Sequence, residues 1–79
     1  GEYVETERTT SNGRIDILIK TKDYVYVIEI KTDSTPDDAL AQIEEKGYAR
    51  PFADDHRKIF KIGVNFSTVD RRIDGWKVV

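Results

Sequence analysis

Hydrophobic and polar residues alternate in several segments of this chain, which is the pattern of strands whose two faces meet different surroundings. These segments are rich in Ile, Val and Tyr, residues that favour strands. Five segments are therefore predicted as strands: residues 2–9, 13–20, 24–31, 59–66 and 71–79. In the last of them, which we expect at an edge of the sheet, Gly75 indicates a bulge or a turn.

A short polar break between the second and third segments fits a β-hairpin. If Lys22 and Asp23 form its loop, Asp16 lies directly opposite Glu29 on the neighbouring strand. Because side chains alternate along a strand, Lys31 shares a face with both carboxylates. The other face carries the apolar residues that we expect to form a core layer: Ile15, Ile17, Ile19, Tyr26, Ile28 and Ile30.

A helix is predicted over residues 36–48. Thr35 is suited to cap its start, Pro36 to occupy the first helical position, and Asp38 to complement the helix dipole. Gly47 is suited either to end it or to allow close packing on the sheet. The helix would connect two parallel strands through a right-handed crossover, which is the usual connection. The fold class expected is α/β (α+β), with a mixed central sheet and one crossover helix.

Length and composition limit the classes of function. The 79 residues make one small domain, residues 1–79, and the absence of an initiator Met predicts that it is a piece of a longer protein. Without cysteine, and with His56 as its single histidine, the chain has neither thiolate nor multi-histidine zinc sites. No apolar run approaches a membrane span, so we expect a cytoplasmic protein. The net charge of −2 does not favour tight nucleic-acid binding by bulk electrostatics, although bound metal ions could supply local positive charge.

The two facing carboxylates are the strongest functional signal. Like charges directly opposite one another in a sheet are destabilising, but a shared divalent cation makes the pair favourable. Lys31 would point at the same place, where it could stabilise charge on a phosphate or help activate a water molecule. The hypothesis is a metal-assisted phosphodiester hydrolase. The alternative is an exposed sheet face on which Lys31 merely pairs with Glu29.

The pattern Asp16, a strand-length gap and then Glu29-Ile30-Lys31 resembles the D…ExK motif of the PD-(D/E)xK nuclease superfamily. Gln42 and Tyr48 resemble the Gln…Tyr signature of its RecB-like branch, with wider spacing than Q-xxx-Y. The sequence GRIDILI…VIEIK…ALAQIEEKGYARPF is similar to that of bacterial domains that follow an AAA-ATPase-like domain in longer proteins.

This resemblance implies a restriction-endonuclease-like core whose first helix is not recognisable here. It implies Mg²⁺ or Mn²⁺ as cofactor, held by Asp16, Glu29 and the backbone carbonyl of Ile30. Lys31 would be catalytic with the two carboxylates, and Gln42 and Tyr48 would bind the substrate. The substrate implied is nucleic acid, with DNA favoured.

Two alternatives to an active nuclease remain. A degenerate domain could keep the scaffold for binding or oligomerisation alone. The intact acidic pair and lysine argue against this, whereas the missing first helix and the acidic pI of about 5.3 argue for it. Without the first helix, one apolar face of the sheet could also stay uncovered, which would favour a homo-oligomer.

Overall fold

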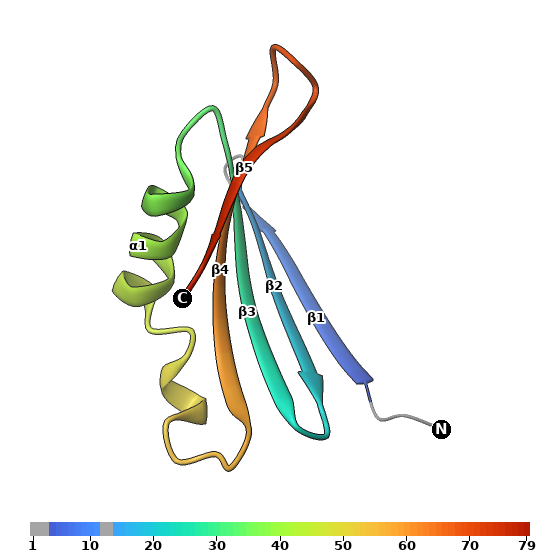
Figure 1. Ribbon diagram of the computed structural model, residues 1–79, viewed down its shortest axis with the longest axis vertical. Coiled ribbons are helices and arrows are strands. Elements are labelled where there is room, and N and C mark those ends of the chain that lie inside the picture. The colour runs from blue at the N-terminus through green and yellow to red at the C-terminus, as the bar shows by residue number, and fades with distance from the viewer. Residues whose placement is uncertain (1–3, 12–13) are drawn as a thin grey trace.

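The computed structural model describes residues 4–11 and 14–79, which form one mixed five-stranded sheet and one long helix (Figure 1). The strands lie in the order of the chain, from β1 at one edge to β5 at the other. The elements are β1 (Val4–Ser11), β2 (Arg14–Thr21), β3 (Tyr24–Thr32), α1 (Pro36–Lys46), the 3₁₀ turn η1 (Arg50–Phe52), β4 (Lys58–Ser67) and β5 (Arg72–Val78). The strands predicted over 2–9 and 13–20 begin outside the described residues, and the helix is two residues shorter than predicted.

The predicted hairpin register is confirmed. β2 and β3 pair antiparallel, with Asp16 opposite Glu29 and Arg14 opposite Lys31. The Thr21 hydroxyl oxygen accepts a hydrogen bond from the Tyr24 backbone N–H at 3.0 Å and closes the turn. The loop position therefore sets the pairing of the whole hairpin, as it does in hairpins generally.

The residues predicted to cap the helix do so at both ends. The Thr35 hydroxyl accepts from the Asp38 N–H at 3.0 Å, and Gly47 follows the last helical residue with a φ of 67°. Between them α1 connects β3 to β4, and these strands pair in parallel as predicted. The handedness of this connection stays a prediction.

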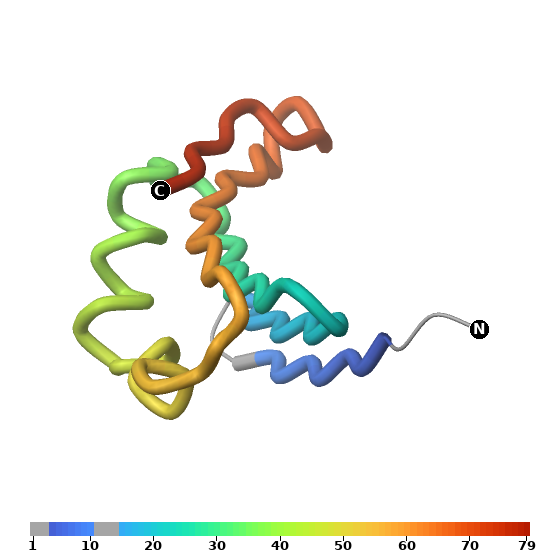
Figure 2. Tube along the Cα trace, turned by 60° about the horizontal axis from the view of Figure 1, so that its bottom comes forward, coloured from blue at the N-terminus to red at the C-terminus, as the bar shows by residue number. Residues whose placement is uncertain are grey.

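The core lies on the opposite face of the sheet from the one predicted. Val25 and Val27, on the same face of β3 as Glu29, are buried against Ile43 of α1. The isoleucines predicted as a core layer are only half-buried, and Figure 2 shows α1 on one side of the sheet with no described element on the other. Both faces of this hairpin are apolar enough to attract a helix, so alternation alone cannot tell which face the helix covers.

The expected irregularity near Gly75 is a bulge between β4 and β5. Asn65 pairs with Gly75, but Phe66 pairs with Ile73, which leaves Asp74 as the extra residue. The bulge aims the Asp74 carboxylate at the buried Asn65 amide, which donates to it at 2.8 Å. Asn65 also accepts from the Ser34 N–H at 2.7 Å, so one buried side chain links β4, β5 and the loop before α1.

Candidate metal centre

Asp16 and Glu29 face each other on the side of the sheet that α1 covers. They are direct partners in the antiparallel pair β2–β3, where opposite side chains have Cβ atoms about 5 Å apart. Glu29 is 0% exposed and Asp16 is half-buried. The alternative of a solvated sheet face is therefore wrong at Glu29.

A buried carboxylate beside a second one is an expensive arrangement. Removing a charged group from water costs free energy that a partner must offset, and the two like charges add repulsion. Carboxylate oxygens are the ligands that Mg²⁺ and Mn²⁺ prefer, and Mg²⁺ commonly takes one or two of them while water and phosphate complete its shell. The acidic pair fits such a cation. Within the described residues no group of three or more Asp, Glu, His or Cys side chains could hold a metal ion. The protein would therefore supply only a few of the ligands of such a cation.

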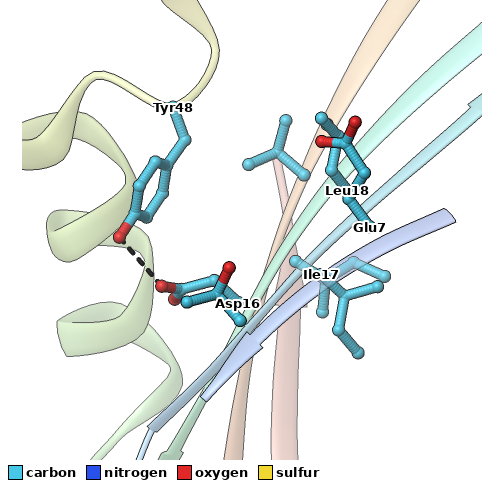
Figure 3. A pocket seen from close by; sticks show the side chains of 8 residues that line it. Glu7, Asp16, Ile17, Leu18 and Tyr48 are labelled. Carbon is cyan, nitrogen blue, oxygen red and sulfur yellow. Dashed lines mark hydrogen bonds between the residues drawn. The ribbon is translucent and has the colours of Figure 1, made fainter. Parts of the chain in front are cut away.

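Tyr48 joins this pair from the end of the helix. Its hydroxyl donates to Oδ2 of Asp16 at 2.8 Å (Figure 3). Sequence analysis named both residues, but it assigned Tyr48 to substrate and did not connect it to Asp16. They are 32 residues apart in the chain, and only the packing of α1 on the sheet brings them together.

The other predicted site residues lie on β3 and on α1. Lys31 is half-buried at the end of β3, two residues after Glu29 and on the same face. Gln42 is half-buried on α1, and its amide donates to Glu45 of the same helix at 3.1 Å. The side chain of Ile30 belongs to the opposite face, so only its backbone could serve a metal. Roles for these three residues stay predictions.

A pocket of about 210 Å³ opens beside Asp16, and sequence analysis gave no functional role to two polar residues that line it, Glu7 and Thr9. Thr9 pairs with Asp16, and Glu7 pairs with Leu18, so the first strand lays both side chains along the pocket. Figure 3 shows Tyr48 on one side of it and the strands on the other. The alternation of the first strand and a correct β1–β2 register would have been the signal.

The loop after β3 is tied to the turn that follows the neighbouring strand β4, at the same end of the sheet. The Asp33 carboxylate accepts hydrogen bonds from the backbone N–H of Thr68, at 3.0 Å, and from its hydroxyl. These bonds hold the pKa of Asp33 below its usual value, and the bond from the Thr68 hydroxyl contributes most. The loop that follows Lys31 is thus anchored, which steadies the end of the strand that carries the predicted catalytic lysine.

The hairpin thus carries an Asp and a Glu that face each other, a lysine follows the Glu by two residues, and a helix packs over this face. The model of the PD-(D/E)XK nuclease superfamily matches residues 1–76. The chain belongs to the PD-(D/E)XK nuclease superfamily.

One relative of this superfamily member is a protein of Azotobacter chroococcum mcd 1 named "Uncharacterized protein in vnfD 5′ region". The two are 38% identical over 80 residues, which cover 99% of this chain and 16% of that protein. The chain thus spans about a sixth of the relative's length. No solved structure matches the chain.

Membership of the PD-(D/E)XK superfamily indicates a nuclease-type function, and nucleases of this superfamily generally use divalent metals. It agrees with the mixed sheet and single helix found here. None of the described helices is long and apolar enough to cross a membrane.

Proposed function

We propose that this domain hydrolyses phosphodiester bonds of nucleic acid, with DNA as the favoured substrate, at a divalent cation held by Asp16 and Glu29. The observation that carries the proposal is the direct pairing of these carboxylates on the helix-covered face, with Glu29 fully buried. Nothing in the packing of a sheet favours such a pair, whereas a shared cation does.

The proposed roles follow from position. A bound Mg²⁺ or Mn²⁺ would acidify an attacking water and offset charge on the phosphate. Asp16 and Glu29 would hold it through their side chains, with the Ile30 carbonyl as a further ligand. Lys31, on the same face, would orient the water and stabilise charge that develops on the phosphate oxygens. Gln42 and the ring of Tyr48 are the proposed substrate contacts.

We further propose that the domain belongs to the RecB-like branch and acts beside an AAA-ATPase-like domain in a longer protein. Gln42 and Tyr48 on and after α1 support the first part. The Azotobacter relative, of which the aligned region is only 16%, is compatible with the second.

Binding of Mn²⁺ tests the acidic pair. We expect saturable Mn²⁺ binding by calorimetry, weakened at least about tenfold in Asp16→Asn and in Glu29→Gln, because each substitution removes one anionic ligand. The melting temperature of the wild type should rise with Mn²⁺, since a ligand that binds only the folded state stabilises it, and the two variants should lose this rise.

Asp37→Asn is the control for these variants. Asp37 is an exposed carboxylate on the first turn of α1, where it pairs with Lys77, and its loss should leave the Mn²⁺ affinity unchanged. The proposed site would be contradicted if the wild type did not bind Mn²⁺ at millimolar concentration. It would also be contradicted if Asp16→Asn and Glu29→Gln bound Mn²⁺ as tightly as Asp37→Asn and the wild type.

The second candidate function is self-association through the sheet face that α1 does not cover. We call this the open face, and its apolar residues include Ile15, Ile17, Ile19, Tyr24, Tyr26, Ile28, Ile30, Phe60, Ile62, Val64, Trp76 and Val78. Trp76 is 70% exposed and Val78 is 50% exposed. Five strands about 4.8 Å apart and about 23 Å long give the open face an area of roughly 550 Å². A standard interface uses about 800 Å² per partner, so two copies meeting on this face would form a weak dimer.

Light scattering tests this association. The average mass should rise with protein concentration in the wild type, and Ile28→Lys should abolish the rise because it places a charge at the centre of the open face. Val69→Lys is the matched control, since Val69 is 87% exposed in the turn after β4 and lies outside that face. A constant monomer mass over the whole concentration range would disprove the association.

A further inference from the structure

The end of α1 directs Tyr48 towards the sheet. Gly47 has a left-handed backbone conformation, its N–H donates to the Glu44 carbonyl at 3.1 Å, and the Tyr48 N–H donates to the Ile43 carbonyl at 3.3 Å. These two bonds are those of a Schellman motif, in which the residue after the glycine packs back on the helix. Tyr48 accordingly packs against the cluster of Val25, Val27 and Ile43.

From this anchored position the hydroxyl reaches Asp16. The hydrogen bond to Oδ2 is 2.8 Å long and partly buried. A carboxylate offers about four lone-pair directions, and the bond from Tyr48 uses one of them. A hydrogen bond to an ionised acceptor is also about twice as strong as one between neutral groups.

The hydrogen bond from Tyr48 to Asp16 counteracts the repulsion between the two acidic side chains. Asp16 is half-buried beside an open pocket, whereas Glu29 opposite it is fully buried. Without a restraint, Asp16 could rotate towards the pocket and away from Glu29, which would relieve the repulsion and separate the two ligands.

We propose that Tyr48 is a positioning residue whose hydroxyl holds the Asp16 carboxylate opposite Glu29, in the place where both can bind one cation. This inference rests on the proposed function. It assigns the Tyr48 hydroxyl to the protein's own carboxylate and leaves the aromatic ring as a wall of the pocket. Residues that hydrogen-bond to metal ligands typically contribute 10–100-fold to metal affinity.

Tyr48→Phe tests the proposal because it removes the hydroxyl and keeps the ring. We expect the dissociation constant for Mn²⁺, measured by calorimetry, to rise about tenfold or more. In the metal-free protein, NMR side-chain couplings of Asp16 should change from those of one χ1 rotamer to averaged values. The matched control is Tyr26→Phe, which removes a hydroxyl from the open face and should change neither quantity.

The two measurements separate this proposal from the proposed function. If the wild type binds Mn²⁺ and Tyr48→Phe binds it equally well with unchanged Asp16 couplings, the positioning role is wrong and the metal site stands. If the wild type binds no Mn²⁺ but the couplings average in Tyr48→Phe, the hydroxyl does position Asp16 and the proposed metal site is wrong. A loss of folding stability alone, with both readouts unchanged, would mean that Tyr48 only packs.

Discussion

Lys31→Ala is expected to slow phosphodiester cleavage by about 10²–10³-fold, which is the usual loss when one group that stabilises transition-state charge is removed. Lys31 lies two residues after the buried Glu29 and on the same face of β3, and in the proposed site its ammonium would contact the phosphate held at the acidic pair. Because the Lys31 ammonium does not bind a metal ion, the affinity of the variant for Mn²⁺ should stay within about twofold of the wild-type affinity. Single-turnover cleavage of labelled DNA with Mn²⁺, beside calorimetry, measures both quantities.

Lys22→Ala is the control for the loss of a lysine. Lys22 is exposed in the turn between β2 and β3, beyond the end of the strand that carries Asp16, and its loss should affect neither cleavage nor Mn²⁺ binding. Cleavage by Lys31→Ala at the wild-type rate would rule out the catalytic role. Arginine should not replace Lys31 fully, because its planar guanidinium presents charge and donors in a different geometry.

Gly63→Ala is expected to have the largest effect on stability. Gly63 pairs with Glu29 across β3 and β4, and a Cβ at this position would lie 2.3 Å from the Pro36 carbonyl oxygen and 2.9 Å from Leu40 Cγ. The first of these is backbone, so α1 must move away from the sheet. Overpacking typically costs 1–3 kcal/mol, and we expect a loss of about 3 kcal/mol in the free energy of unfolding, measured in urea.

Such a loss matters in a domain of this size. At about 0.05–0.15 kcal/mol per residue, 79 residues give a total stability of roughly 4–12 kcal/mol. Gly75→Ala is the matched control, because its Cβ would meet only the Pro36 ring, at 3.2 Å, and should cost less than about 1 kcal/mol. Equal stabilities of the two alanine variants would show that the close contact of α1 with the sheet at Gly63 is not what requires glycine there.

Much of the candidate site could be predicted because its decisive contact is local. Asp16 and Glu29 belong to one hairpin, and the position of its loop sets their register. The helix limits were also close to correct, since Thr35 and Gly47 act through hydrogen bonds within a few residues. The D…ExK spacing, taken together with the hairpin, the helix with Gln42 and Tyr48 and the next apolar strand, therefore indicated the superfamily before any tertiary contact was known.

The sequence by itself determined the strands, the hairpin register and the acidic pair with its neighbouring lysine, because these follow from alternation and from contacts between near residues. Only the tertiary structure decided that α1 covers the acidic face, that Tyr48 reaches Asp16, and that Gly63 must lack a side chain. Each of these depends on how a helix sits on a sheet with two apolar faces. That choice is made by the summed packing of residues far apart in the chain, and no local pattern encodes it.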